Sequence, residues 1–68
     1  MIVELNGRPI EVPDHATVEV VVSELAIDTA RRGIAVAVDA AVVPRSEWER
    51  RRLSDGARVE VLAAMQGG

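Results

Sequence analysis

Hydrophobic and polar residues alternate at the start of the chain in the pattern of a β-hairpin. Within residues 1–5, Met, Val and Leu occupy one face of a strand, and Ile and Glu occupy the other. Asn6-Gly7 follows, and both residues tolerate the positive φ values of a two-residue hairpin turn. Residues 8–12 predict the returning strand, with Ile10 and Val12 on one face. Pro13 closes this strand because proline lacks the N–H that a ladder needs.

A helical stripe comes next along the chain. Thr17 is placed as an N-cap, and Glu19 suits the positive end of a helix. Apolar residues then recur at i, i+3, i+4 and i+7, at Val18, Val21, Val22 and Leu25. The β-branched run at residues 20–22 locally favours a strand instead. We predict a helix, because the cap is present and the stripe continues to Leu25.

The second half of the chain predicts two further strands before the last one. A loop over residues 28–33 leads to IAVAV at 34–38, where large and small apolar residues alternate. This pattern puts Ile34, Val36 and Val38 on the core and leaves Ala35 and Ala37 on a flat outer face. That face suits a partner, but alanine is also common on ordinary exposed sheets. Residues 42–44 predict a short edge strand that ends at proline.

The last strand is predicted after one helical turn and one tight turn. Residues 46–50 form the helical turn, from which Trp48 packs back as a lid on the core. Asp55-Gly56 makes the tight turn. In residues 58–63, Val59, Val61 and Ala63 face one way, and Arg58, Glu60 and Leu62 face the other.

This order of elements predicts an α+β fold, in which one helix packs across a mixed β-sheet. The first and last strands are both apolar, so we expect them to be central and side by side. They then run parallel, and the helix lies in a right-handed crossover between them. We expect one domain over residues 1–63 and a flexible C-terminal tail over residues 64–68.

Composition narrows the function classes. The chain has 68 residues, no cysteine and a net charge of −3, which argues against disulfides, thiolate metal sites and nucleic-acid binding. All eight basic residues are arginine, so lysine-linked polymers of this chain are excluded. The basic run at residues 50–52 is read as a solvated face, with a docking patch as the alternative. Without a signal peptide or membrane span, we expect a cytoplasmic protein that binds no membrane.

The sequence offers no catalytic constellation. Its single histidine, His15, falls in a predicted loop, and the serines at 23, 46 and 54 have no positioned base. Metal binding by His15 would need further ligands that are not clustered with it. Neither a phosphate-binding glycine loop nor a tuned carboxylate pair is present. We therefore expect neither an enzyme nor a bound cofactor.

The chemistry is predicted to reside in the tail. Residues 64–68 read Ala-Met-Gln-Gly-Gly and carry no side-chain charge. Without Cβ atoms, Gly67-Gly68 can thread a narrow tunnel, and five extended residues reach roughly 17 Å. A frayed terminus is the alternative.

These residues resemble the ThiS family of thiamine-biosynthesis sulfur carriers, which have the ubiquitin-like β-grasp fold. The resemblance rests on MIVELNG at 1–7, GIAVAV at 33–38, VPRSEW at 43–48 and the terminal Gly-Gly. The chain departs from the family at two turns. It has Asp39-Ala40 where Asn-Gly is usual, and Gly56-Ala57 where Gly-Asp is favoured.

The resemblance implies a mechanism centred on Gly68. An ATP-dependent, E1-like activating enzyme adenylates the Gly68 carboxylate, and a sulfur donor enzyme converts it to a thiocarboxylate. The thiocarboxylate then delivers sulfur to thiazole synthase. Gly67 and Gln66 would thread the partner, while Leu62 and Met65 are candidate docking residues. Either docking residue could instead pack on the domain's own core.

Two other functions stay open at this point. One is a sulfur carrier for another pathway such as molybdopterin synthesis, although such tails place prolines before Gly-Gly and this one has none after Pro44. The other is a non-covalent ubiquitin-like interaction module, whose terminal glycines would be incidental.

Overall fold

The computed structural model describes residues 1–24 and 33–63, and their core is a five-stranded mixed sheet. The strands are β1 (Ile2–Leu5), β2 (Arg8–Glu11), β3 (Ile34–Val38), β4 (Ala41–Val42) and β5 (Arg58–Ala63). Their order across the sheet is β2-β1-β5-β3-β4. Strand β5 is central and runs parallel to β1, while the other pairs are antiparallel. The predicted α+β fold and the parallel pairing of the first and last strands are confirmed.

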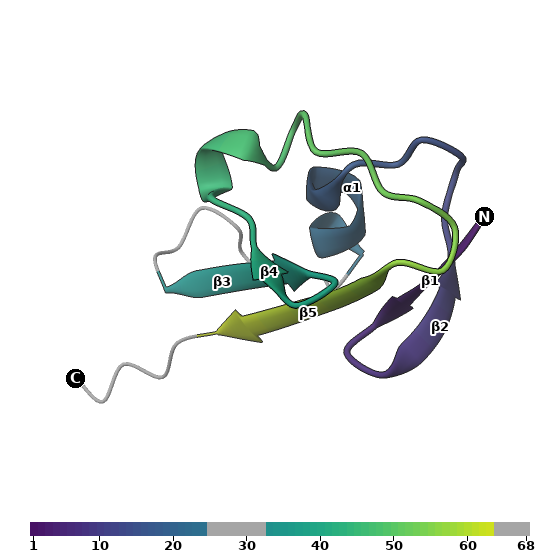
Figure 1. Cartoon of the computed structure of the whole chain (residues 1–68), viewed down its shortest axis with the longest axis horizontal. Coiled ribbons are helices and arrows are strands. Elements are labelled where there is room, and N and C mark those ends of the chain that lie inside the picture. The colour runs from purple at the N-terminus through teal and green to yellow at the C-terminus, as the bar shows by residue number, and fades with distance from the viewer. Residues whose placement is uncertain (25–32, 64–68) are drawn as a thin grey trace.

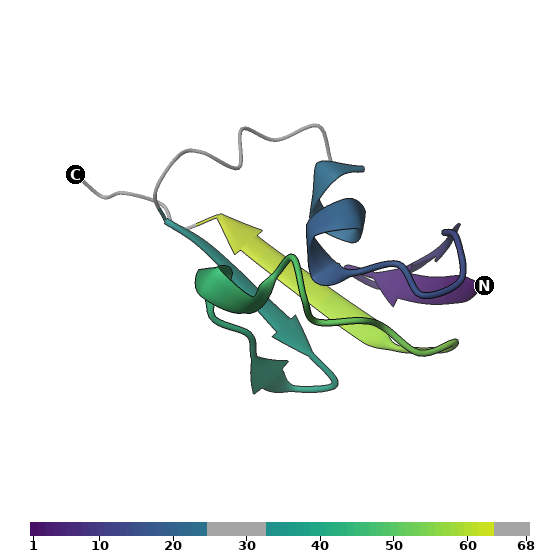
Figure 2. The ribbon, with the colours of Figure 1, turned by 90° about the horizontal axis from the view of Figure 1, so that it is seen from above.

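Among residues 1–24 and 33–63, the segments that cover the sheet lie on one of its faces. Helix α1 (Val18–Ser23) and the segment from β4 to β5 lie on the same side, as Figures 1 and 2 show. Thr17 caps the helix by accepting a hydrogen bond from the Val20 N–H at 3.4 Å. Val18, Val21 and Val22 are buried, whereas Val20 is exposed. Burial of one stripe thus overrides the strand preference of the valine run. The predicted stripe member Leu25 and the 28–32 part of the predicted loop lie outside the described residues.

The core is built almost entirely from aliphatic side chains. Within the described residues, no polar or charged side chain is buried. Val3, Val36 and Val59 from three neighbouring strands pack with the helix valines and with Trp48, which is 1% exposed. The Trp48 Nε1–H donates to the Val43 carbonyl at 3.0 Å. The predicted packing of Trp48 on the core is therefore confirmed, and the side chain is fully enclosed.

Several predicted boundaries need correction. Strand β4 is Ala41–Val42, one residue earlier than predicted, because the Asp39-Ala40 turn pairs Val38 with Ala41. The helical turn predicted over residues 46–50 is a 3₁₀ turn, η1 (Arg45–Glu47). Strand β1 begins after Met1, and β2 ends before Val12, so each is one residue shorter than predicted. The Val12 N–H still donates to the Met1 carbonyl at 2.8 Å.

Two hairpin turns require positive φ at both central residues. Asn6 and Gly7 have φ values of 50° and 84°, and Asp39 and Ala40 have values of 49° and 71°. Asparagine, aspartate and glycine tolerate this region, whereas the Cβ of alanine crowds the backbone there. The second hairpin therefore contains a strained residue, at one of the two turns where the chain departs from the family it resembles.

We expect Ala40→Gly to stabilise the fold by about 0.5–1 kcal/mol. The relief of the left-handed strain exceeds the extra entropy that glycine loses on folding. The midpoint of urea unfolding, followed by circular dichroism, measures the change. Ala41→Gly is the matched control, because the neighbouring Ala41 is in β4 without a positive φ; this change should destabilise. A lower midpoint for Ala40→Gly would contradict the prediction.

Candidate functional site

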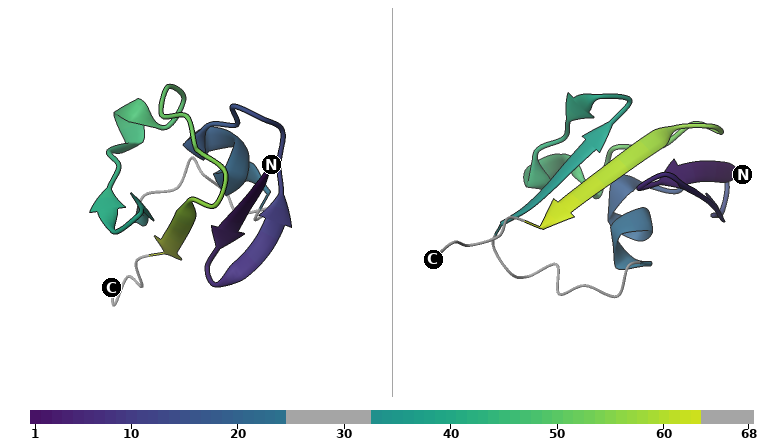
Figure 3. Two further views of the ribbon diagram at one scale, coloured as in Figure 1. Left: turned by 45° about the vertical axis from the view of Figure 1, so that its right-hand side comes forward. Right: turned by 90° about the horizontal axis from the view of Figure 1, so that it is seen from below.

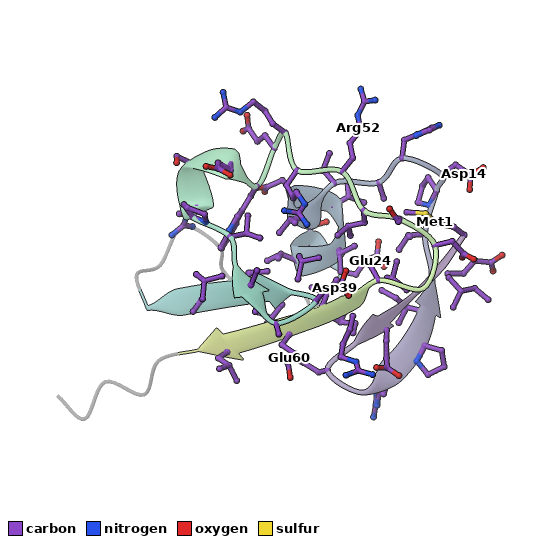
Figure 4. All side chains as sticks on the ribbon, in the orientation of Figure 1. Met1, Asp14, Glu24, Asp39, Arg52 and Glu60 are labelled. Carbon is purple, nitrogen blue, oxygen red and sulfur yellow. The ribbon has the colours of Figure 1, made fainter. Side chains whose placement is uncertain are left out.

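The candidate site lies at the end of β5, after which residues 64–68 continue the chain. Along β5, Val59 and Val61 point into the core and are 0% and 6% exposed. Arg58, Glu60 and Leu62 point to the opposite, uncovered face of the sheet, as alternation along a strand requires. Figure 4 shows Glu60 on the side of the sheet opposite α1. The predicted orientation of β5 is therefore confirmed for residues 58–62.

Leu62 lies among other aliphatic residues on this outer face. It is 67% exposed and pairs directly with Ala35 of β3. Ala37 is two residues further along β3 and pairs on its other side with Val42 of β4, which is 75% exposed. Directly paired residues share a face of the sheet. Ala35, Ala37, Val42 and Leu62 thus form one patch, here called the aliphatic patch.

Charged side chains of β1 and β5 lie beside this patch on the outer face. The Arg58 Nε donates to the Glu4 Oε1 of the parallel strand β1 at 3.1 Å. Both side chains are substantially exposed, so solvent screens their charges and the ion pair contributes little to the stability of the fold. Glu60 of β5 pairs with Ala37 of the neighbouring strand β3. The aliphatic patch is therefore bordered by charge toward the start of β5 and lies toward its end.

An exposed apolar patch with a charged border is typical of a surface that meets another protein. Flat alanines allow close approach, and Leu62 and Val42 supply protruding aliphatic groups. Leu62 does not belong to the buried core cluster. Its role in docking stays a prediction, and so do the roles of Met65, Gln66, Gly67 and Gly68, which lie outside the described residues.

Other chemistry-bearing groups are dispersed over the described surface. His15 is an exposed loop residue with a φ of 67°. Among residues 1–24 and 33–63, no three His, Asp or Glu side chains gather into a group that could hold a metal ion. Within the same ranges, no helix has the length and hydropathy needed to cross a membrane. Figure 4 shows Arg52 on the helix side, away from Glu60.

Two contributors to this site escaped the sequence analysis. Val42 was predicted to lie in an edge strand, but its exposure was not predicted. A strand this short has too few residues for the pattern to define a buried and an exposed face. Asn6 was read only as a turn residue, yet its side chain bonds to the main chain of Val61. These two residues are far apart in sequence, so no local pattern indicates the contact.

Solved structures share this fold, and a family model matches nearly the whole chain. The model of the ThiS family matches residues 2–68. The crystal structure of the thiamine biosynthesis protein ThiS from Geobacter metallireducens is similar, with a TM-score of 0.76, 28% identity and full coverage of both chains. A solution NMR structure of a thiamine biosynthesis protein from the same organism gives a TM-score of 0.75 at 28% identity, covering all of this chain and 88% of the other. Comparison with curated protein sequences gave no significant match.

Proposed function

Because this chain belongs to the ThiS family, we propose that it is a sulfur carrier of thiamine biosynthesis whose working group is the Gly68 carboxylate. The observation that carries the proposal is the extent of the family match, which runs through Gly67-Gly68. The similar structures from Geobacter metallireducens bear the name of thiamine biosynthesis proteins, which favours this pathway over other sulfur-transfer pathways.

The arrangement of β5 supports the proposal. The tail follows directly from the central strand, which is bonded to β1 on one side and to β3 on the other. A central strand gives a fixed starting point, and five residues suffice to carry a carboxylate deep into a partner. The aliphatic patch lies beside this starting point. Docking through the patch would align the tail with the partner's active site.

The proposed chemistry starts from a poor electrophile. A carboxylate does not react with a sulfur nucleophile until its oxygen is converted to a leaving group. An ATP-dependent, E1-like enzyme would join the Gly68 carboxylate to AMP and release pyrophosphate. The terminal sulfur of a persulfide on a sulfur donor enzyme would then attack the acyl carbon and displace AMP. A thiol would cleave the remaining S–S bond and free the thiocarboxylate.

The carrier would contribute recognition and reach, while its partners supply catalysis. Thiazole synthase would be the acceptor of the sulfur, as the resemblance to the family implies. A thiocarboxylate suits this transfer because its sulfur is a better nucleophile than a carboxylate oxygen. ATP would be bound by the activating enzyme rather than by this chain. The proposal also assigns the carrier to the cytoplasm.

Intact mass spectrometry tests this function. The chain is incubated with ATP, a sulfur donor and an activating enzyme that is competent on another carrier. The expected result is a mass gain equal to the replacement of one oxygen by sulfur, located at Gly68 and absent without ATP. No gain under these conditions would refute the carrier function and favour a non-covalent interaction module.

Leu62→Ala should weaken docking without weakening the fold. We expect the KM for the carrier in the activation reaction to rise about tenfold, the effect of losing one well-packed anchor residue. The free energy of unfolding should change by less than about 0.5 kcal/mol, because Leu62 is outside the core. Steady-state kinetics and urea unfolding measure the two effects.

Ile2→Ala is the matched control for this change. Ile2 is also an exposed aliphatic residue, at 53%, and the Gly56 N–H donates to its carbonyl at the opposite end of β5 from Leu62. Its truncation should leave KM within about twofold. Equal effects of the two substitutions would remove the aliphatic patch from the docking surface.

A further inference from the structure

Hydrogen bonds between the first and last strands recur at every second residue, at Ala57 just before β5 and at Val59 within it. The Glu4 N–H donates to the Ala57 carbonyl at 2.9 Å, and the Asn6 N–H donates to the Val59 carbonyl at 2.9 Å. Parallel ladders space their bonds in this way. The next rung would fall at Val61. Figure 3 (right) shows β5 lying between β3 and β1.

The backbone of β1 cannot supply that rung. After Asn6 the chain turns back into β2 through Gly7, whose φ is 84°. The side chain of Asn6 takes the place of the missing residue. Its Oδ1 accepts from the Val61 N–H at 2.8 Å, and its Nδ2 donates to the Val61 carbonyl at 3.3 Å. A carboxamide has the same donor and acceptor as a peptide group, so it continues the ladder by one rung.

We propose that Asn6 is a positioning residue for the carrier's tail, a proposal that rests on the function proposed above. On the β3 side, β5 is paired as far as Ala63, which is opposite Ile34. On the β1 side, the Asn6 side chain is the final tie among the described residues. Asn6 thereby sets the point at which β5 separates from β1, two residues before the strand ends at Ala63.

The hydrogen bonds of Asn6 affect the reaction by setting the fraction of molecules in which the end of β5 is held in place. A β5 end that is held on both sides starts the tail in one direction, next to the aliphatic patch. If the β1 side opens, only a fraction of carriers presents Leu62 and the tail together. The apparent affinity for a partner then falls by that fraction. The effect belongs to KM and not to the chemical step, because Asn6 does not touch the reacting carboxylate.

The chain contains a matched control at its other hairpin. Asp39 is likewise the first residue of a two-residue turn, with a φ of 49° against 50° for Asn6. Its Oδ1 also accepts from the β5 main chain, from the Arg58 N–H at 3.0 Å. Asp39 therefore holds the beginning of β5, whereas Asn6 holds its end. Glycine tolerates the backbone of both positions, so Asn6→Gly and Asp39→Gly each remove a side-chain tie and leave the turn intact.

The test compares these two variants with the wild-type chain in the activation reaction. Thiocarboxylate formation is measured by intact mass at varied carrier concentration. We expect Asn6→Gly to raise the KM about fivefold, the ratio that corresponds to one ordinary hydrogen bond, with kcat within about twofold. Asp39→Gly should leave both constants within about twofold. Hydrogen exchange should show faster exchange of the Val61 amide in Asn6→Gly alone.

Each outcome decides the proposal. An unchanged KM in Asn6→Gly, or equal rises in both variants, would overturn the positioning role while the carrier function stands. Absence of product from the wild-type chain would overturn the carrier function and this proposal with it. Should Asn6→Gly fail to fold, Asn6→Asp replaces it, because aspartate keeps the acceptor for the Val61 N–H and removes the donor. A raised KM in that variant supports the role, and an unchanged one overturns it.

Discussion

Adding one alanine after Gly68 is expected to lower thiocarboxylate formation by at least about a hundredfold. The addition converts the Gly68 carboxylate to a peptide bond, which cannot be adenylated. It also moves the new carboxylate about 3.5 Å further along an extended tail. Displacements of this size are large compared with the precision that a transferring group requires. Intact mass spectrometry of the reaction with the activating enzyme measures the loss.

The extended chain should fold like the wild-type chain, because the change lies beyond β5 and its core contacts. Equal midpoints of urea unfolding would establish this. The wild-type chain, mixed into the same reaction as an internal standard, should still gain the mass of the sulfur exchange. Unimpaired reaction of the untrimmed extended chain would show that the free Gly68 carboxylate is dispensable, and would leave a surface-binding function in its place.

Trp48→Ala should remove most of the stability of the domain. The substitution empties the largest buried position of the described core and is expected to cost about 3–5 kcal/mol. A single core in a chain of this length rarely supplies more than about that amount. We therefore expect no cooperative urea transition by circular dichroism, and no thiocarboxylate formation because the body that partners recognise is lost.

Trp48→Phe separates the packing of the ring from its hydrogen bond. Phenylalanine retains an aromatic ring in the core, but the Val43 carbonyl loses the Nε1–H donor at 3.0 Å. We expect a folded protein that is less stable by about 1–3 kcal/mol. A Trp48→Ala variant as stable as Trp48→Phe would mean that the core collapses around the gap.

The sequence predicts the elements whose signals are local. Asn6-Gly7 carries its own turn chemistry, Thr17 its own cap, and residues 58–63 their own alternation. The parallel pairing of β1 with β5 was also predictable, because both strands are apolar and the helix supplies a crossover between them. These features depend on neighbours in sequence or on general rules of topology.

Features that depend on distant neighbours were not predictable. The complete burial of Trp48 depends on core residues distant in sequence, and the tie of Asn6 to Val61 joins residues 55 positions apart. The strain at Ala40 follows from the register of the second hairpin, in which β4 begins one residue earlier than predicted. The threading role of Gly67-Gly68 came from their lack of Cβ atoms, the activation of Gly68 came from the family resemblance, and both remain predictions.

The central place of β5 also determines how the molecule responds to force. A partner that draws the tail into a tunnel pulls along the axis of β5. That pull is parallel to the strand, so it shears the bonds to β1 and β3 together instead of opening them one after another. Loads applied in this direction are shared by many hydrogen bonds, and the domain should resist being unravelled from its C-terminal end. A β-strand at the edge of the sheet would give the same tail a weaker anchor.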